Sequence, residues 1–178
     1  TYEDSSFDWV VVHAGLHHCA SPHKALCEML RVARKGILVF EARDSLLVRW
    51  GVSLGFTTDF ETQCLALTDG KVGGYRDTIY PNYVYRWVER EVVKTVNSFI
   101  PQFEHLFSFH YGYRIPIRVL KMSPRFSIRL VAYLFQFLVP IAQIVAPKMG
   151  NEFAFTVSKG GPLRPWLKLE EEEIVPNM

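Results

Sequence analysis

Four histidines fall between positions 13 and 23 of the chain, and their side chains are the first candidates for chemistry. They are His13, His17, His18 and His23. Imidazole binds transition metals and exchanges protons near neutral pH. The cluster therefore has three possible interpretations: a metal site, a catalytic centre, or the connection between a strand and the helix that follows it.

A zinc site would require the four imidazoles to converge on one ion. His13 and His17 have the spacing of one helical turn, but the chain there is leaving a strand, and Gly15 between them indicates a turn. The sequence therefore predicts no metal site. For His17 and His18 it favours hydrogen-bonded histidines at a helix entry, with a base role for one of them as the alternative.

The elements around the histidines are a strand, a helix and a second strand. Residues 9–13 form an apolar, β-branched run, as in a strand buried within a parallel sheet. Ser21 and Pro22 are typical of a helix start, and Gly36 is expected to end the helix. A second apolar strand follows and ends at Glu41. This order predicts an α/β protein with a parallel crossover.

The rest of the chain continues with an irregular segment, a helix, two strands and a tail. Residues 45–81 show turn signals and room for one short helix, and residues 86–99 have the pattern of an amphipathic helix. Strands are expected within 103–113 and 151–159. Residues 161–178, rich in Gly, Pro and Glu, are expected to form a surface tail.

An uncharged apolar run at 130–147 is long enough to raise the question of a membrane span. On a helix its polar residues form one narrow stripe, made of Arg129, Gln136 and Gln143. Pro140 would interrupt a simple span. This pattern favours a buried or lid helix, with a peripheral membrane contact through 126–146 as the alternative.

Composition narrows the class of protein. The 178 residues are 49% hydrophobic with a net charge of +2, which fits one folded domain and gives no support to nucleic-acid binding. The three cysteines have no CxxC spacing, so a reducing, cytoplasmic setting is expected. The first residues, "TYEDSSFDWV", carry no apolar leader, and the chain is expected to start within a longer protein.

A set of short motifs between Tyr2 and Glu41 points to one family. The motifs are Phe7-Asp8, Leu16-His17-His18, Pro22, Leu26, Glu28-Met29, Arg31-Val32 and Lys35-Gly36. Together they resemble the second half of a class I S-adenosylmethionine-dependent methyltransferase domain of the small-molecule type. The sequence departs from that pattern at Ile37, where the family usually has a second glycine, and it lacks the glycine-rich cofactor loop.

The resemblance implies a Rossmann-like methyltransferase sheet over residues 1–160 that is truncated at its N-terminus, with the fourth to seventh strands present. The insertions are then about 45–81 and 116–147, the second being a helical apolar insertion before the last strand. Half of the cofactor pocket would lie upstream of this sequence, so this piece alone is expected to be inactive.

The implied function is methyl transfer from S-adenosylmethionine to a small-molecule or lipid-like acceptor. His13 and Ala14, at the end of the first strand, are then expected to contact the cofactor, and His18 is the candidate general base. The candidate substrate-binding residues are His17, Glu41, Arg43, Tyr83 and Arg86. Because methyl transfer is an in-line displacement, positioning alone suffices, and few catalytic residues are named.

Plainer alternatives stay open. Glu41 and Arg43 also fit a solvated charge cluster, and Tyr83 and Arg86 also fit a helix entry with surface arginines. The whole chain also fits a non-catalytic or membrane-associated binding module that retains a methyltransferase-like half fold. A nicotinamide-dependent enzyme on a similar sheet has no positive feature here, although fold does not fix function.

Overall fold

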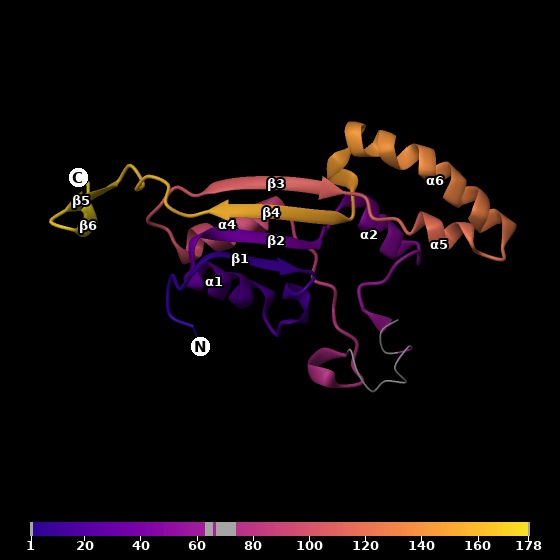
Figure 1. Ribbon diagram of the computed structural model, residues 1–178, viewed down its shortest axis with the longest axis horizontal. Helices are drawn as coiled ribbons and strands as arrows, with labels where there is room; N and C mark the ends of the chain where they lie inside the picture. The colour runs from indigo at the N-terminus through magenta and orange to yellow at the C-terminus, as the bar shows by residue number, and fades with distance from the viewer. Residues whose placement is uncertain (1, 63–65, 67–73, 178) are drawn as a thin grey trace.

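The computed structural model describes residues 2–62, 66 and 74–177. Its centre is a four-stranded sheet in the order β1–β2–β4–β3 (Figure 1). The strands are β1 (Phe7–His13), β2 (Ala33–Ala42), β3 (Leu106–Gly112) and β4 (Glu152–Ser158). β1 and β2 are parallel, whereas β4 runs antiparallel to both of its neighbours, β2 and β3. The predicted α/β architecture with a parallel crossover is confirmed.

The crossover helix α1 (Pro22–Val32) begins where the sequence predicts, because Ser21 Oγ accepts the backbone N–H of Lys24 at 3.3 Å. It does not end at Gly36, as expected, but at Val32, and Gly36 lies inside β2. A Cβ on Gly36 would sit 2.4 Å from the carbonyl oxygen of Val157 on β4. The glycine is thus a strand residue that allows close strand contact, not a helix stop.

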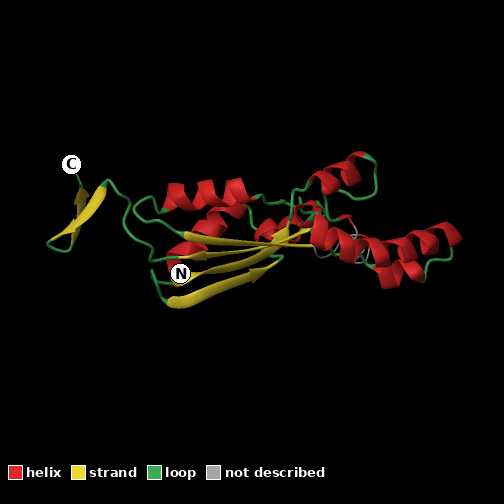
Figure 2. Cartoon of the chain, turned by 90° about the horizontal axis from the view of Figure 1, so that it is seen from above, coloured by secondary structure: helices red, strands yellow, loops and turns green. Residues whose placement is uncertain are grey.

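One face of the sheet carries the hydrophobic core. Helices α1 and α4 (Glu89–Phe99) cover it, and Figure 2 shows helices along this side. The core includes Leu26, Leu30, Ile37, Val39, Trp87, Val92, Val96, Phe153, Phe155 and Val157, all fully or almost fully buried. Alternation along β4 turns its two phenylalanines and Val157 toward these helices.

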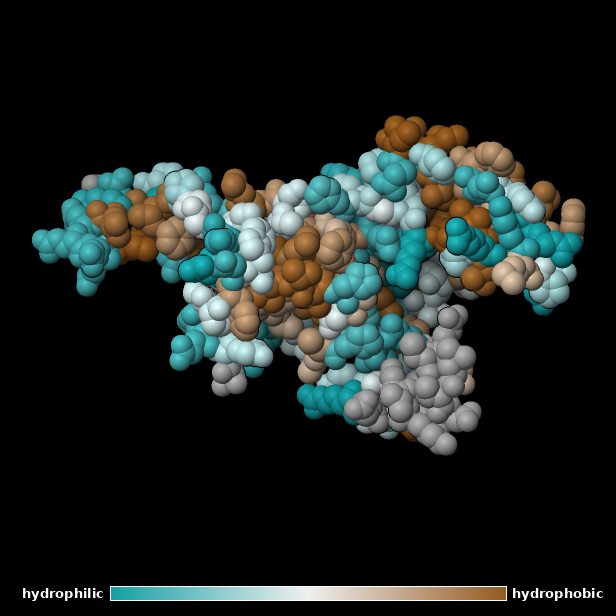
Figure 3. All heavy atoms as spheres, viewed as in Figure 1, coloured by the Kyte–Doolittle hydropathy of each residue, from teal (hydrophilic) through white to brown (hydrophobic). Residues whose placement is uncertain are grey.

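The opposite face is open over the part of the chain that the structure describes. Trp9 and Val11 of β1 are 45% and 60% exposed, and Phe40 of β2 is exposed beside them. Figure 3 shows hydrophobic atoms gathered at the centre of this face. Among the described residues β1 pairs only with β2, so its other edge is free.

The described residues of the segment after β2 include one helix and one turn. Helix α2 (Leu46–Ser53) is the short helix expected within residues 45–81, and a 3-10 turn spans Tyr75–Asp77. Residues 63–65 and 67–73 of that prediction lie outside the described residues. Helix α4 starts three residues later than predicted, because Trp87 is extended and donates its backbone N–H to the carbonyl oxygen of Ala42 at 2.9 Å.

The apolar insertion forms two helices, α5 (Ile117–Lys121) and α6 (Phe126–Val145), which project beyond the strand ends (Figure 1). α6 is long and apolar enough to cross a membrane, and only Ala132 of it is buried. Of the favoured interpretation, a buried or lid helix, the buried form is therefore wrong, and the lid helix stays a prediction. The buried form failed because hydrophobic periodicity does not say what covers an apolar face.

The polar stripe of α6 faces the protein as its spacing predicts. Gln143 Nε2 donates to the carbonyl oxygen of Tyr111 at the end of β3 (2.7 Å), and Gln136 accepts from Lys121 Nζ. Arg129 donates to the carbonyl oxygen of Ser123 at 3.2 Å. These bonds fix α6 on α5 and on the sheet, with its apolar side turned outward.

The predicted surface tail contains a small hairpin. Its strands are β5 (Leu167–Glu170) and β6 (Glu173–Pro176), joined by Glu171 and Glu172, which have φ values of 47° and 71°. Figure 1 shows it at the opposite end of the sheet from α6, far from the site described next.

Candidate functional site

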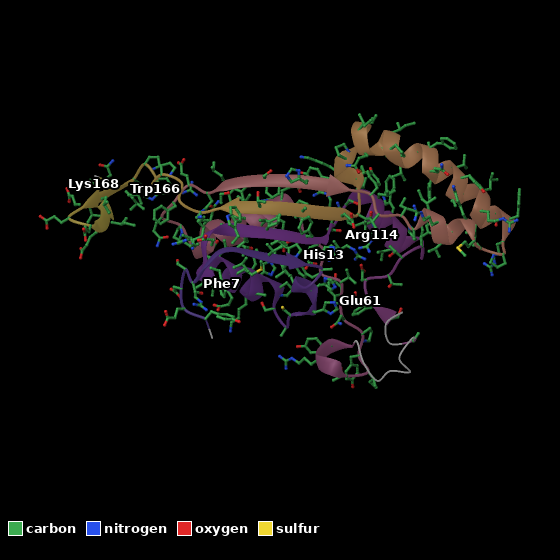
Figure 4. The ribbon with its side chains drawn as sticks, viewed as in Figure 1. Phe7, His13, Glu61, Arg114, Trp166 and Lys168 are labelled. Carbon is green, nitrogen blue, oxygen red and sulfur yellow. The ribbon has the colours of Figure 1, made fainter. Side chains whose placement is uncertain are left out.

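A crevice of about 390 Å³ opens at the carboxyl ends of the parallel strands. In an α/β sheet this is where ligands bind, because the loops that leave the strands diverge there. The ends of β1 and β2 contribute His13, Ala14, His17 and Glu41, and the far wall comes from β3, β4 and their flanks with His110, Tyr111, Arg114, Asn151 and Phe153. Figure 4 shows His13 at the end of β1, with Arg114 and Glu61 beyond that end of the strand. Four predicted site residues thus line one crevice.

Glu41 shapes the turn at the end of β1. Its carboxylate is almost fully buried, and Oε1 accepts the backbone N–H groups of Gly15 (2.8 Å) and Leu16 (2.6 Å). Ala14 has a φ of 47° and donates its N–H to the carbonyl oxygen of Phe40 at 2.8 Å. The left-handed residue lets the chain reverse from the strand into the turn Leu16–His18. Glu41 is therefore a structural anchor of the crevice rim.

The two adjacent histidines have different environments. His17 is buried, with Nδ1 2.8 Å from Glu41 Oε2, and its Nε2 lies 3.4 Å from Glu61 Oε1. The hydrogen bond that His17 donates to the Glu41 carboxylate raises the pKa of His17 against the opposing effect of burial. The His18 side chain is 47% exposed, with Nδ1 2.9 Å from Asn82 Nδ2. The base role of His18 stays a prediction.

Glu61 and Asn82 are the site residues that the sequence did not reveal. Asn82 is 3% exposed and packs between His18 and the Glu61 carboxylate, which its Nδ2 approaches to 3.5 Å. Both come from the irregular segment between β2 and α4, which has no periodicity to place them. The sequence offered only the fact that their side chains are polar, and many other residues of the chain have polar side chains.

Arg43 is not in the crevice. Its guanidinium is bidentate to Glu89, with N–O distances of 3.0 and 3.1 Å, donates to the carbonyl oxygen of Lys148, and lies over the Tyr111 ring. Burial raises the pKa of Glu89, but hydrogen bonds from Arg43 and Tyr111 outweigh it and lower that pKa to about 2. This ion pair ties the end of β2 to the start of α4 and the end of β3, so the structure gives Arg43 a positioning role.

Tyr83 and Arg86 lie in a separate hollow of about 550 Å³ beside α2. Arg86 donates to Asp59 and to the carbonyl oxygen of Thr58, and Tyr83 packs edge-on against Phe60. The predicted substrate-binding residues are thus divided: His17 and Glu41 line the strand-end crevice, whereas Tyr83 and Arg86 line this second hollow.

Comparison with known proteins matches the family expectation. Residues 1–40 match the family model described as a methyltransferase domain. Over these residues the chain is similar to a methyltransferase domain. The matched segment includes β1, α1 and most of β2, and the α/β sheet to which these strands belong has a Rossmann-like arrangement. No curated protein matches the chain.

Solved structures give distant similarities. An S-adenosylmethionine-dependent methyltransferase from Thermotoga maritima is 14% identical with a TM-score of 0.46, and the match covers 89% of this chain and 58% of that one. A Bacillus halodurans protein assigned as a methyltransferase is 12% identical with a TM-score of 0.39, over 89% and 66% of the two chains. The chain therefore spans about six-tenths of the length of these structures.

Proposed function

We propose that the protein transfers a methyl group from S-adenosylmethionine to an apolar, lipid-like acceptor at a membrane surface. The observation that supports methyl transfer is the strand-end crevice, which opens at the end of β1 within the methyltransferase-domain segment. The proposal has two parts, the cofactor and the acceptor, and different residues support each.

The crevice chemistry fits part of the cofactor. His13 and Ala14 present an imidazole ring and backbone groups at the rim, while Phe40 and Ala154 form an apolar floor. These residues would hold the polar methionine end of S-adenosylmethionine against an apolar surface. The cofactor supplies an activated methyl group on a sulfonium. The task of the chain is then to orient the acceptor and exclude water, because an in-line displacement depends on alignment.

The helical hairpin α5–α6 supports an acceptor that resides in lipid. Its outward side carries exposed large apolar residues, namely Phe126, Leu130, Val131, Tyr133, Leu134, Phe137, Leu138, Ile141, Ile144 and Val145. An apolar surface of this extent on a helix is typical of a binding interface. Figure 3 shows hydrophobic atoms exposed in the region of α6.

Charge around the hairpin favours an anionic lipid surface as its partner. Residues 105–151 contain no Asp or Glu, and their basic residues are Arg114, Arg118, Lys121, Arg125, Arg129 and Lys148. Each basic residue close to an anionic membrane contributes about 1 kcal/mol of attraction. Apolar side chains with flanking basic groups are the combination that binds helices to the membrane interface.

The hydrogen bonds of α6 favour a helix that lies on the membrane over one that crosses it. With 20 residues α6 is about 30 Å long, which is sufficient for a span. A span would break the bond from Gln143 to Tyr111 and leave two glutamines in the hydrocarbon. An interfacial helix keeps these bonds and still buries its apolar side.

Vesicle sedimentation tests the acceptor half of the proposal. The purified protein should sediment with phosphatidylcholine vesicles that contain about one-third phosphatidylserine, and this binding should fall as salt is raised. Replacing two exposed arginines together (Arg118→Gln with Arg125→Gln) should weaken binding by about 30-fold, from about 1 kcal/mol for each charge. Replacing Phe137→Ser should weaken binding at every salt concentration.

The matched control removes the same charge elsewhere. Arg34 and Lys168 are exposed basic residues outside the α5–α6 helices, and Arg34→Gln with Lys168→Gln should bind vesicles like the unmodified protein. Equal loss in both double variants, or no binding to anionic vesicles at all, would contradict the membrane-surface proposal. The proposal would also be contradicted if the protein methylated only soluble acceptors.

A further inference from the structure

We infer that His17, His18 and Glu61 bind a divalent transition-metal ion, zinc by preference, at the mouth of the strand-end crevice. The inference does not depend on methyl transfer, because it rests on the spacing and the hydrogen bonds of these three side chains. One ligand atom from each lies within 4.8 Å of the others. Two imidazoles and a carboxylate are a donor set that zinc accepts in proteins.

His17 is oriented as metal-binding histidines are. Its Nδ1 contacts the buried carboxylate of Glu41 at 2.8 Å, and Glu41 is held in turn by two backbone N–H groups. A histidine that donates Nδ1–H to a carboxylate presents the lone pair of Nε2 on its other side. In this arrangement Glu41 fixes the ring and Nε2 becomes the ligand.

The Nε2 atom of His17 lacks a hydrogen-bond partner within the described residues, although His17 is only 9% exposed. It faces Glu61 Oε1 at 3.4 Å, and His18 Nε2 faces Glu61 Oε2 at 3.7 Å. Both distances exceed a usual hydrogen bond. Two ligands on one tetrahedral zinc, each about 2.0–2.1 Å from it, lie about 3.4 Å apart. The spacing thus corresponds to atoms that share an ion.

His18 and Asn82 set a further condition. Binding through His18 Nε2 requires a proton on His18 Nδ1, which then donates to the oxygen of the Asn82 amide. The amide therefore presents Oδ1 to His18 in the metal-bound form. A His18 bound in this way has no free nitrogen left to act as a general base, so the metal site and the base role exclude each other.

The competing arrangement is a charged His17 ring held between the carboxylates of Glu41 and Glu61 without any ion. It places the same atoms together but binds no metal. Only the first arrangement binds one zinc ion per chain. Zinc binding can be measured without any assay of catalysis.

Calorimetric titration of the untagged, chelator-treated protein with zinc alone tests the inference. One ion per chain should bind, and the Glu61→Gln and His18→Asn variants should each bind at least about ten-fold more weakly. Both side chains are partly exposed, so these variants should keep the circular dichroism spectrum of the unmodified protein. Cobalt should give the visible absorption of a tetrahedral site in the unmodified protein and lose it in both variants.

Two histidines outside the cluster provide controls. His23 contacts Glu91 and His110 contacts Ser108, and the His23→Gln and His110→Gln variants should bind zinc unchanged. Absence of zinc binding, affinity that the His18 and Glu61 variants do not lower, or equal loss in the control variants would overturn the inference. X-ray absorption that shows a sulfur ligand would also overturn it.

Discussion

Replacement of Glu89 by glutamine should destabilise the fold more than any exposed charge change. The Glu89 carboxylate accepts two hydrogen bonds from Arg43 and one from the Tyr111 hydroxyl at 2.7 Å. The Arg43 and Glu89 side chains are 8% and 24% exposed. The substitution leaves the buried guanidinium without its carboxylate, which is the costly way to disrupt a buried ion pair.

The magnitude follows from the pKa of Glu89. A decrease from the ordinary value of 4.5 to about 2 corresponds to at most about 3 kcal/mol of stability. Because the folded pKa is the lower one, this contribution is complete above pH 4.5 and is lost as the pH falls toward 2. The difference in unfolding free energy between the unmodified protein and Glu89→Gln should therefore lie between about 1 and 3 kcal/mol at pH 7 and approach zero near pH 2.

Urea unfolding followed by circular dichroism at several pH values between 2 and 7 measures this difference. The control is Asp8→Asn, since Asp8 pairs with Arg34 and Lys35 in an exposed position and its loss should change the midpoint little. A difference below 1 kcal/mol at pH 7 for Glu89→Gln, or one that does not change with pH, would refute the assignment of Arg43 and Glu89 as a buried structural pair.

Three further substitutions test the core and the crossover. Phe155→Ala removes a fully buried ring from the centre of the sheet and should cost about 3–5 kcal/mol in urea unfolding. Gly36→Ala places a Cβ 2.4 Å from the Val157 carbonyl oxygen, so it should cost about 1–3 kcal/mol, whereas an ordinary helix-stop glycine would show less. Ser21→Ala removes the N-cap of α1 and should cost about 1 kcal/mol; an unchanged midpoint would contradict the capping role.

The sequence predicted the elements whose signals are local. Strand β1 and the start of α1 follow from an apolar run and from Ser21 and Pro22, and both lie where expected. The end of α1 was wrong because Gly36 serves the packing of β2 against β4, a contact between segments about 120 residues apart in sequence. Packing of this kind has no local pattern.

The parts of the candidate site that lie at strand ends were also predictable from the sequence. His13, Ala14, His17 and Glu41 line one crevice at the strand ends. The strand–helix–strand pattern implied that these two strand ends are adjacent. The partners Glu61 and Asn82 come from an irregular segment, and the sequence does not say which of its polar residues meets the histidines. The outward side of α6 was misjudged for a related reason, since a protein core and a lipid surface favour the same apolar residues.

Binding of S-adenosylmethionine to the purified full-length protein is the most direct test of the proposed function. Calorimetric titration should show saturable binding, and Ala14→Glu, which places a carboxylate at the end of β1 in the strand-end crevice, should abolish it. The control variant Tyr83→Phe lies in the separate hollow beside α2 and should bind unchanged. Absence of detectable binding to the unmodified protein, or binding that Ala14→Glu does not weaken, would contradict the methyltransferase account and favour a binding module that retains only the fold.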